Sequence, residues 1–96
     1  MIHEIASLTI DPARSAAFEA AVARARPFFA VADGFLSFGL QRVIENPARY
    51  QLIVGWDSVE AHMVRFRASP GLQEWRRLAG PFFVEPPSVI HVAAII

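Results

Sequence analysis

Three side chains in this sequence have the chemistry to ionise a weakly acidic organic molecule and hold the anion. His62 could act as a general base, because an imidazole exchanges protons near neutral pH. Arg76 could orient an anionic oxygen, and the indole N–H of Trp56 could donate a hydrogen bond to it. His62, Arg76 and Trp56 are therefore the candidate catalytic residues. The structural alternatives are a half-exposed helix residue, a solvated charge and a core or interface side chain.

Large apolar side chains could form a pocket around these groups. We expect the substrate pocket to be lined by Phe18, Val22, Phe66, Trp75, Phe82 and Phe83. An aromatic, mostly apolar cavity between helices and sheet suits a flat hydrophobic ligand. The alternative is that these side chains simply fill the core. Convergence of the candidate catalytic residues on one open cavity would favour an enzyme, and a filled interior would count against it.

The sequence offers little for a metal or cofactor. It has no cysteine, no glycine-rich nucleotide loop and no H-E-x-x-H motif. His3 and His91 fall on the first and last expected strands, so a two-histidine metal site is geometrically possible. We favour ordinary hydrogen bonding, because the nearby acid Glu4 points to the face opposite His3 and supplies no third ligand. We expect no metal and no cofactor.

Hydrophobic periodicity and turn residues indicate the elements that would position these side chains. Strands are expected at 2–10, 35–44, 49–56 and 89–95, with helices at about 12–31, from about 57, and at 70–79. Asp57 and Glu60 resemble a capping box for the second helical segment, which would carry Val59, His62, Met63 and Phe66 on one side. The order β-α-β-β-α-β predicts an α+β, ferredoxin-like fold with a four-stranded antiparallel sheet.

The apolar content suggests that the sheet is covered on both faces. The chain has 96 residues, which predicts a single domain over 1–96, and 54% of them are hydrophobic. Both helices of this fold lie on one face of the sheet, yet 52–54 and 92–96 are apolar on both sides. A second copy would cover the helix-free sheet face. The sequence thus predicts a homodimer that forms a dimeric α+β barrel.

Charge and hydropathy argue against several other classes of partner. Nine basic residues, all arginine, balance nine acidic ones, so we expect no nucleic-acid binding. The longest uncharged apolar stretch, 86–96, is too short to span a bilayer, and the N-terminus lacks the features of a signal peptide. We therefore expect no membrane association and a cytoplasmic location.

Three segments carry a family resemblance. The run from Tyr50 to His62, with Trp-Asp-Ser-Val-Glu-Ala-His at its end, precedes 66–70 (Phe-Arg-Ala-Ser-Pro) and 75–83 (Trp-Arg-Arg-Leu-Ala-Gly-Pro-Phe-Phe). Together they resemble the antibiotic biosynthesis monooxygenase domain family, in the dimeric α+β barrel superfamily. The resemblance implies a pocket between helices and sheet in which an ionised phenol reduces O2 without a cofactor.

The match to the functional residues of such enzymes is partial. Trp56 and Arg76 could match a tryptophan and an arginine with pocket roles, and His62 falls near a tyrosine. The asparagine has no counterpart, since Asn46 lies in a turn. Relatives that degrade haem use an asparagine on the first strand, where this chain has Ala6, so we expect no haem degradation.

Two functions follow as hypotheses. The first is a cofactor-independent monooxygenase that oxidises a small aromatic or polyketide-like phenol with O2, with His62 as base and with Arg76 and Trp56 holding the anion. The second is a non-enzymatic dimeric module that binds a hydrophobic metabolite in the same pocket. An isomerase or quinone-handling enzyme would need the same pocket and a single acid/base residue.

Overall fold

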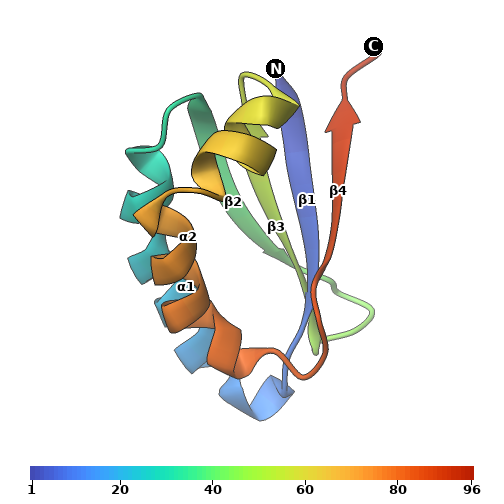
Figure 1. Ribbon diagram of the computed structural model, residues 1–96. Helices are drawn as coiled ribbons and strands as arrows, with labels where there is room; N and C mark the ends of the chain where they lie inside the picture. Colours follow the sequence, from blue (N-terminus) through green and yellow to red (C-terminus); the bar gives the residue numbers. More distant parts are fainter.

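A computed structural model describes all residues, 1–96, and shows one antiparallel sheet covered on one face by helices (Figure 1). The strands are β1 (Ile2–Thr9), β2 (Phe35–Arg42), β3 (Arg49–Trp56) and β4 (Ser88–Ala93). Their order in the sheet is β2-β3-β1-β4, so the two central strands are β3 and β1. The predicted α+β, ferredoxin-like arrangement is confirmed.

The first helical segment follows the predicted capping signal closely. The Asp11 side chain accepts a hydrogen bond from the backbone N–H of Ala13, and Pro12 opens a short 3₁₀ turn, η1 (Pro12–Arg14). Helix α1 (Ser15–Ala30) continues from it and buries an apolar stripe of Phe18, Ala21, Val22, Ala25 and Phe29. Gly34 then turns the chain into β2 with a φ of 85°, a conformation that favours glycine.

The second helical segment differs from the sequence-based expectation. It is the π-helix η2 (Ala61–Phe66), and the backbone N–H of Ala61 donates to the hydroxyl of Ser58. The predicted capping box of Asp57 and Glu60 is therefore wrong. The wider π turn buries His62 and Phe66. Val59 and Met63, which we had expected on that face, are exposed because they lie on the other side of the turn.

A shorter helix completes the layer. Ser69 precedes α2 (Pro70–Ala79), which buries Leu78 and Ala79 and packs chiefly against α1. A final 3₁₀ turn, η3 (Gly80–Phe82), leads to β4. None of the helices combines the length and the apolar composition that a membrane span needs.

Strand register decides which side chains share a face. On β1, Glu4 lies opposite Val54 of β3 and His91 of β4, whereas His3 lies opposite Val92. Side chains alternate along a strand, so His3 and His91 point to opposite faces. The possible two-histidine metal site is therefore wrong. His91 instead shares the helix-covered face with Glu4.

The helix-free face carries apolar side chains that no element of this chain covers. Ile5 lies beside Ile53 and Ile90 there, and His3 lies beside Val92. Ile90 is 55% exposed and Val92 38% exposed. This face is where the sequence predicts a second copy.

Candidate active site

A cavity of about 290 Å³ lies between the helices and the β1–β4 side of the sheet. Its wall combines aromatic and aliphatic side chains with four ionisable groups. The lining residues are Glu4, Ala6, Leu8, Phe29, His62, Phe66, Arg67, Leu72, Trp75, Arg76, Gly80, Phe83, Pro87 and Val89. A mostly apolar site with a few convergent polar groups is the usual form of a small-molecule site.

The carboxyl group of Glu4 is the deepest polar group of this wall. Glu4 is 5% exposed, and its Oε1 accepts a hydrogen bond of 3.0 Å from the indole N–H of Trp56. Trp56 itself is completely buried and packs against Phe29, Phe35 and Phe66. The tryptophan thus fixes the carboxyl group from behind and does not reach the cavity.

His62 lies between Glu4 and the last strand. Its Nε2 is 3.4 Å from Oε1 of Glu4, and its Nδ1 forms a 2.9 Å hydrogen bond with Nε2 of His91. The imidazole stacks on the indole of Trp56, with 5.6 Å between ring centroids and 17° between planes. Both ring nitrogens therefore have an ionisable partner, and the stacking fixes the ring plane.

Burial favours the uncharged forms of this pair. Burial raises the pKa of Glu4, although the Trp56 N–H and the charge of Arg67 partly oppose the rise. Burial also lowers the pKa of His62 to about 4, and repulsion from His91 and Arg67 adds to the effect. His62 is therefore a neutral imidazole at neutral pH, and its surroundings oppose a positive charge on the ring.

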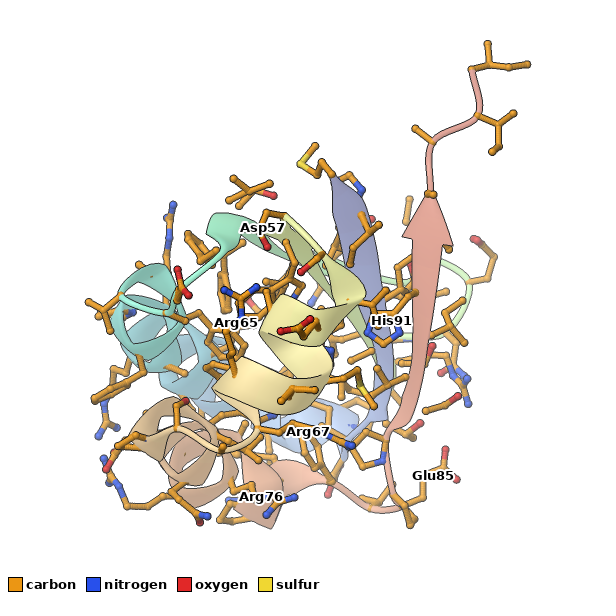
Figure 2. The ribbon with its side chains drawn as sticks, turned by 45° about the horizontal axis from the view of Figure 1, so that its top comes forward. Asp57, Arg65, Arg67, Arg76, Glu85 and His91 are labelled. Atoms are coloured by element: carbon orange, nitrogen blue, oxygen red, sulfur yellow. The ribbon has the colours of Figure 1, made fainter.

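Two arginines line the cavity without a carboxylate partner. Arg67 follows η2 and Arg76 lies on α2, and both are exposed (Figure 2). The arginines that do form ion pairs are Arg42, Arg49, Arg65 and Arg77. Arg67 and Arg76 therefore leave positive charge available at the cavity for an anionic group of a ligand.

The structure brings some of the predicted residues to the cavity and leaves others in the core. The predicted residues on its wall are His62, Phe66, Trp75, Arg76 and Phe83. Phe18 and Val22 are buried between α1 and the sheet, outside the lining. Phe82 packs on Phe18 and beneath the guanidinium of Arg14. Trp56 also lies outside the lining, and its N–H donates to Glu4. It therefore holds a carboxyl group in place and does not make the expected contact with a ligand anion.

Sequence reasoning did not include Glu4, Arg67 and His91 among the catalytic or pocket residues. A signal for Glu4 was present, since a carboxylate that alternates with Ala6 and Leu8 falls on the buried face of its strand. The register of β4 placed His91 beside it, and the π-helix turned His62 towards both. Figure 2 shows the His91 ring on the side of β4 that faces η2.

Other parts of the molecule offer less chemistry. No group of three or more His, Asp or Glu side chains is arranged to hold a metal ion. A second hollow of about 350 Å³ lies between the end of α1 and the start of α2. Its charged side chains, Asp33 and Arg65, pair with each other and leave no free group for a ligand.

Comparison with known proteins identifies the family. Residues 1–78 match the antibiotic biosynthesis monooxygenase family. The chain belongs to this family. It is also 33% identical over 91 residues to the protein YczJ of Bacillus subtilis, a match that covers 95% of this chain and 96% of YczJ.

Solved structures of the antibiotic biosynthesis monooxygenase family share the fold. A crystal structure from Bordetella bronchiseptica, of a protein assigned to these monooxygenases, is 50% identical, with a TM-score of 0.96 and coverage of 99% of this chain and 97% of the other. SnoaB, a cofactor-independent oxygenase from Streptomyces nogalater, is 24% identical, with a TM-score of 0.79 and coverage of 99% and 93%. The second likeness shows the fold alone.

Proposed function

We propose that this protein is a cofactor-independent monooxygenase that oxidises a small aromatic or polyketide-like phenolic substrate with O2. The observation that carries the proposal is the meeting of an aromatic-lined cavity, a buried acid–base pair and two unpaired arginines. The ionised substrate is itself the reductant of O2, so the protein needs to bind, ionise and shield it. One oxygen atom enters the substrate and the other leaves as water.

The shape and lining of the cavity favour a small, flat ligand. Its volume of about 290 Å³ is at the lower end for small-molecule sites, which start at roughly 300 Å³. Trp75, Phe66 and Phe83 contribute aromatic side chains to its lining. Aromatic walls pack well against a planar substrate and keep water from the carbanion or phenolate that reacts with O2.

The ionisable groups match the charge changes of the reaction. Glu4 and His62 form the inner wall and can accept the proton that a phenol must lose. Arg76 and Arg67 then face an anion in a partly desolvated site, where electrostatic stabilisation is stronger than in water. A buried carboxyl–imidazole pair costs stability. A site that only bound a hydrophobic metabolite would have no use for the pair, so it favours catalysis over the non-enzymatic module.

We further propose that the active unit is a homodimer formed through the helix-free sheet face. Members of the family are typically dimeric. The exposed Ile90 and Val92 support this interface, because an apolar sheet face left in water would be costly. Size-exclusion chromatography at low protein concentration tests it, and a stable monomer there would contradict it.

Oxygen consumption with a panel of anthrones and hydroquinones tests the function directly. Turnover should exceed the spontaneous oxidation of each compound, and ¹⁸O2 should place label in the product. The protein should need no added metal, flavin or haem after treatment with a chelator. Ligand-induced thermal stabilisation without oxygen consumption by any compound would instead support a binding module.

A further inference from the structure

Three separate elements bring a chain of hydrogen-bonding groups from the cavity to the edge of the sheet. Glu4 comes from β1 and His62 from η2, and both line the cavity. His91 comes from β4, outside the lining, and is partly exposed. The contacts of 3.4 Å between Glu4 and His62 and 2.9 Å between His62 and His91 make the chain continuous.

We propose that Glu4, His62 and His91 form a proton relay, in which Glu4 takes the proton of the bound phenol and the two histidines deliver it to solvent beside β4. This inference rests on the proposed function, because it assigns the proton acceptor of that reaction. It replaces His62 as the primary base with Glu4. His62 becomes the group that passes the proton on.

The main reason for this assignment is that both ring nitrogens of His62 lie near ionisable partners: Nδ1 is hydrogen-bonded to His91, and Nε2 lies 3.4 Å from Oε1 of Glu4. A neutral imidazole has one N–H and one bare nitrogen. It can therefore donate to only one of its two partners, and moving a proton through the ring exchanges donor and acceptor. A histidine that served only to neutralise Glu4 would need no second ionisable partner. Here the second nitrogen meets another imidazole that leads outward.

The proton transfers balance along the chain. The sequence of transfers starts with Glu4 ionised, a state that the charge of Arg67 and the Trp56 N–H favour, and the phenol O–H bond breaks as an O–H bond forms on the Glu4 carboxylate. That proton then passes from Oε1 of Glu4 to Nε2 of His62, while the Nδ1 proton of His62 passes to Nε2 of His91. The imidazolium formed at His91 releases a proton to solvent, and the phenolate stays in the cavity beside Arg67 and Arg76. No group is oxidised or reduced in these steps.

The surrounding charges keep the proton from resting on His62. Arg67 lies close enough to oppose a positive charge on this ring and to favour ionised Glu4, and His91 adds to the repulsion. From β3, Trp56 contributes only a neutral N–H, which holds Glu4 in place. From α2, Arg76 faces the same cavity. A positive charge on His62 is therefore disfavoured, which fits a transfer in which one proton leaves the ring as the other arrives.

Anaerobic stopped-flow mixing with 4-nitrophenol, below the pKa of that phenol, tests the relay without oxidation chemistry. In the wild type, the absorbance of the phenolate and the proton signal of a pH indicator should rise together. Glu4→Gln keeps an oxygen that can accept the Trp56 hydrogen bond, and it should abolish the phenolate signal. His91→Gln should still form phenolate but release its proton with a lag.

Matched variants control for general damage. Glu60→Gln removes an exposed carboxylate at the start of η2, and His3→Gln removes a histidine from the opposite face of the sheet. Both should behave like the wild type, with the oligomeric state checked by sizing. His91→Ala should release its proton with the same lag as His91→Gln, and added imidazole should remove that lag. Any one of three results would overturn the relay. The phenolate signals could be equal in Glu4→Gln and the wild type, His91→Gln could release its proton without a lag, or the wild type saturated with 4-nitrophenol could form no phenolate.

Side-chain ¹⁵N NMR without any ligand separates this inference from the proposed function. Across the contact between His62 and His91, one nitrogen should carry a proton and the other should be bare. Glu4→Gln and His91→Gln should each shift the tautomer balance of His62, whereas His3→Gln should not. An unchanged His62 spectrum in both relay variants overturns the relay. A relay seen by NMR and 4-nitrophenol, with no turnover of any anthrone or hydroquinone, overturns only the monooxygenase.

Discussion

The helix-covered face of the sheet has two halves that differ in packing. In the half under α1, Phe18 and Tyr50 are both buried, and their rings pack in a T-shaped contact outside the lining of the cavity. In the half between β1–β4 and the helices η2 and α2, Glu4 and His62 border an open cavity. We call these the packed half and the hollow half. The same sheet thus supports a core and a site.

The difference follows from where the helices lie. Helix α1 packs against β2, and Phe18 and Phe29 of its apolar stripe also contact rings on β3. Helix α2 packs on α1 instead, so it leaves space above β1 and β4. Ionisable groups are tolerated only in that space, where they have partners and access to water. Substitutions should therefore affect stability in the packed half and activity in the hollow half.

The largest effect should come from His62→Gln in the hollow half. Removing a group that transfers protons typically lowers the rate by about 100- to 10,000-fold. We expect such a loss in kcat for oxygen consumption, with a free energy of unfolding close to that of the wild type at neutral pH. Chemical denaturation and oxygen-electrode kinetics on the same samples measure both. A rate within a few-fold of the wild type would contradict the expectation that substitutions in the hollow half act on activity.

Phe18→Ala should give the complementary result in the packed half. Phe18 is completely buried, and truncating such a phenylalanine costs about 3–5 kcal/mol. Phe83→Ala, at the partly exposed wall of the cavity, should cost less because its site already borders open space. Urea unfolding of the two variants compares them directly. An equal loss would mean that the hollow half is packed as tightly as the core.

Acidification should destabilise the protein through His62. The unfolded chain protonates this group near pH 6.5, whereas the folded chain does so only near about pH 4, so protons favour the unfolded state between these values. The loss attributable to His62 should reach up to about 3 kcal/mol. This loss is the difference between the pH dependence of the wild type and that of His62→Gln. Thermal or urea unfolding of both proteins across this pH range measures it. Glu4, whose pKa is raised, acts in the opposite sense and remains in both proteins.

Two neighbouring arginines give the smallest and most selective contrast. Arg76 lines the cavity, while Arg77 forms a 2.7 Å ion pair with Glu74. Arg76→Gln should raise KM for a phenolic substrate about tenfold or more, since a hydrogen bond to a charged group contributes about 1.5–3 kcal/mol. Arg77→Gln should leave KM unchanged, because an exposed ion pair contributes little. Equal KM values in the two variants would exclude Arg76 from substrate binding.

The order of elements and the buried stripe of α1 could be predicted because local rules determine them. The Asp11–Pro12 start, the Gly34 turn and the alternation along β1 each act over a few neighbouring residues. The cap of the second helical segment could not be predicted with certainty, because Asp57 and Ser58 are both good caps and the π turn shifts the register.

The candidate site was predicted less completely than the fold. His62 and Arg76 were chosen for their chemistry, and the structure does place both on one cavity. Their partners depend on distances that no local pattern encodes. Trp56 illustrates this: its sequence position suggests a wall of the pocket, yet its N–H is taken by a carboxyl group from another strand.

The sequence by itself determined the family, the element order and the inventory of ionisable groups, because these follow from residue types and short-range periodicity. Only the tertiary structure decided which of those groups meet. The pairing of β1 with β4 brought His91 beside Glu4 and away from His3, and the π-helix turned His62 between them. A candidate site assembled from several elements depends on strand register and helix packing, which are properties of the whole fold.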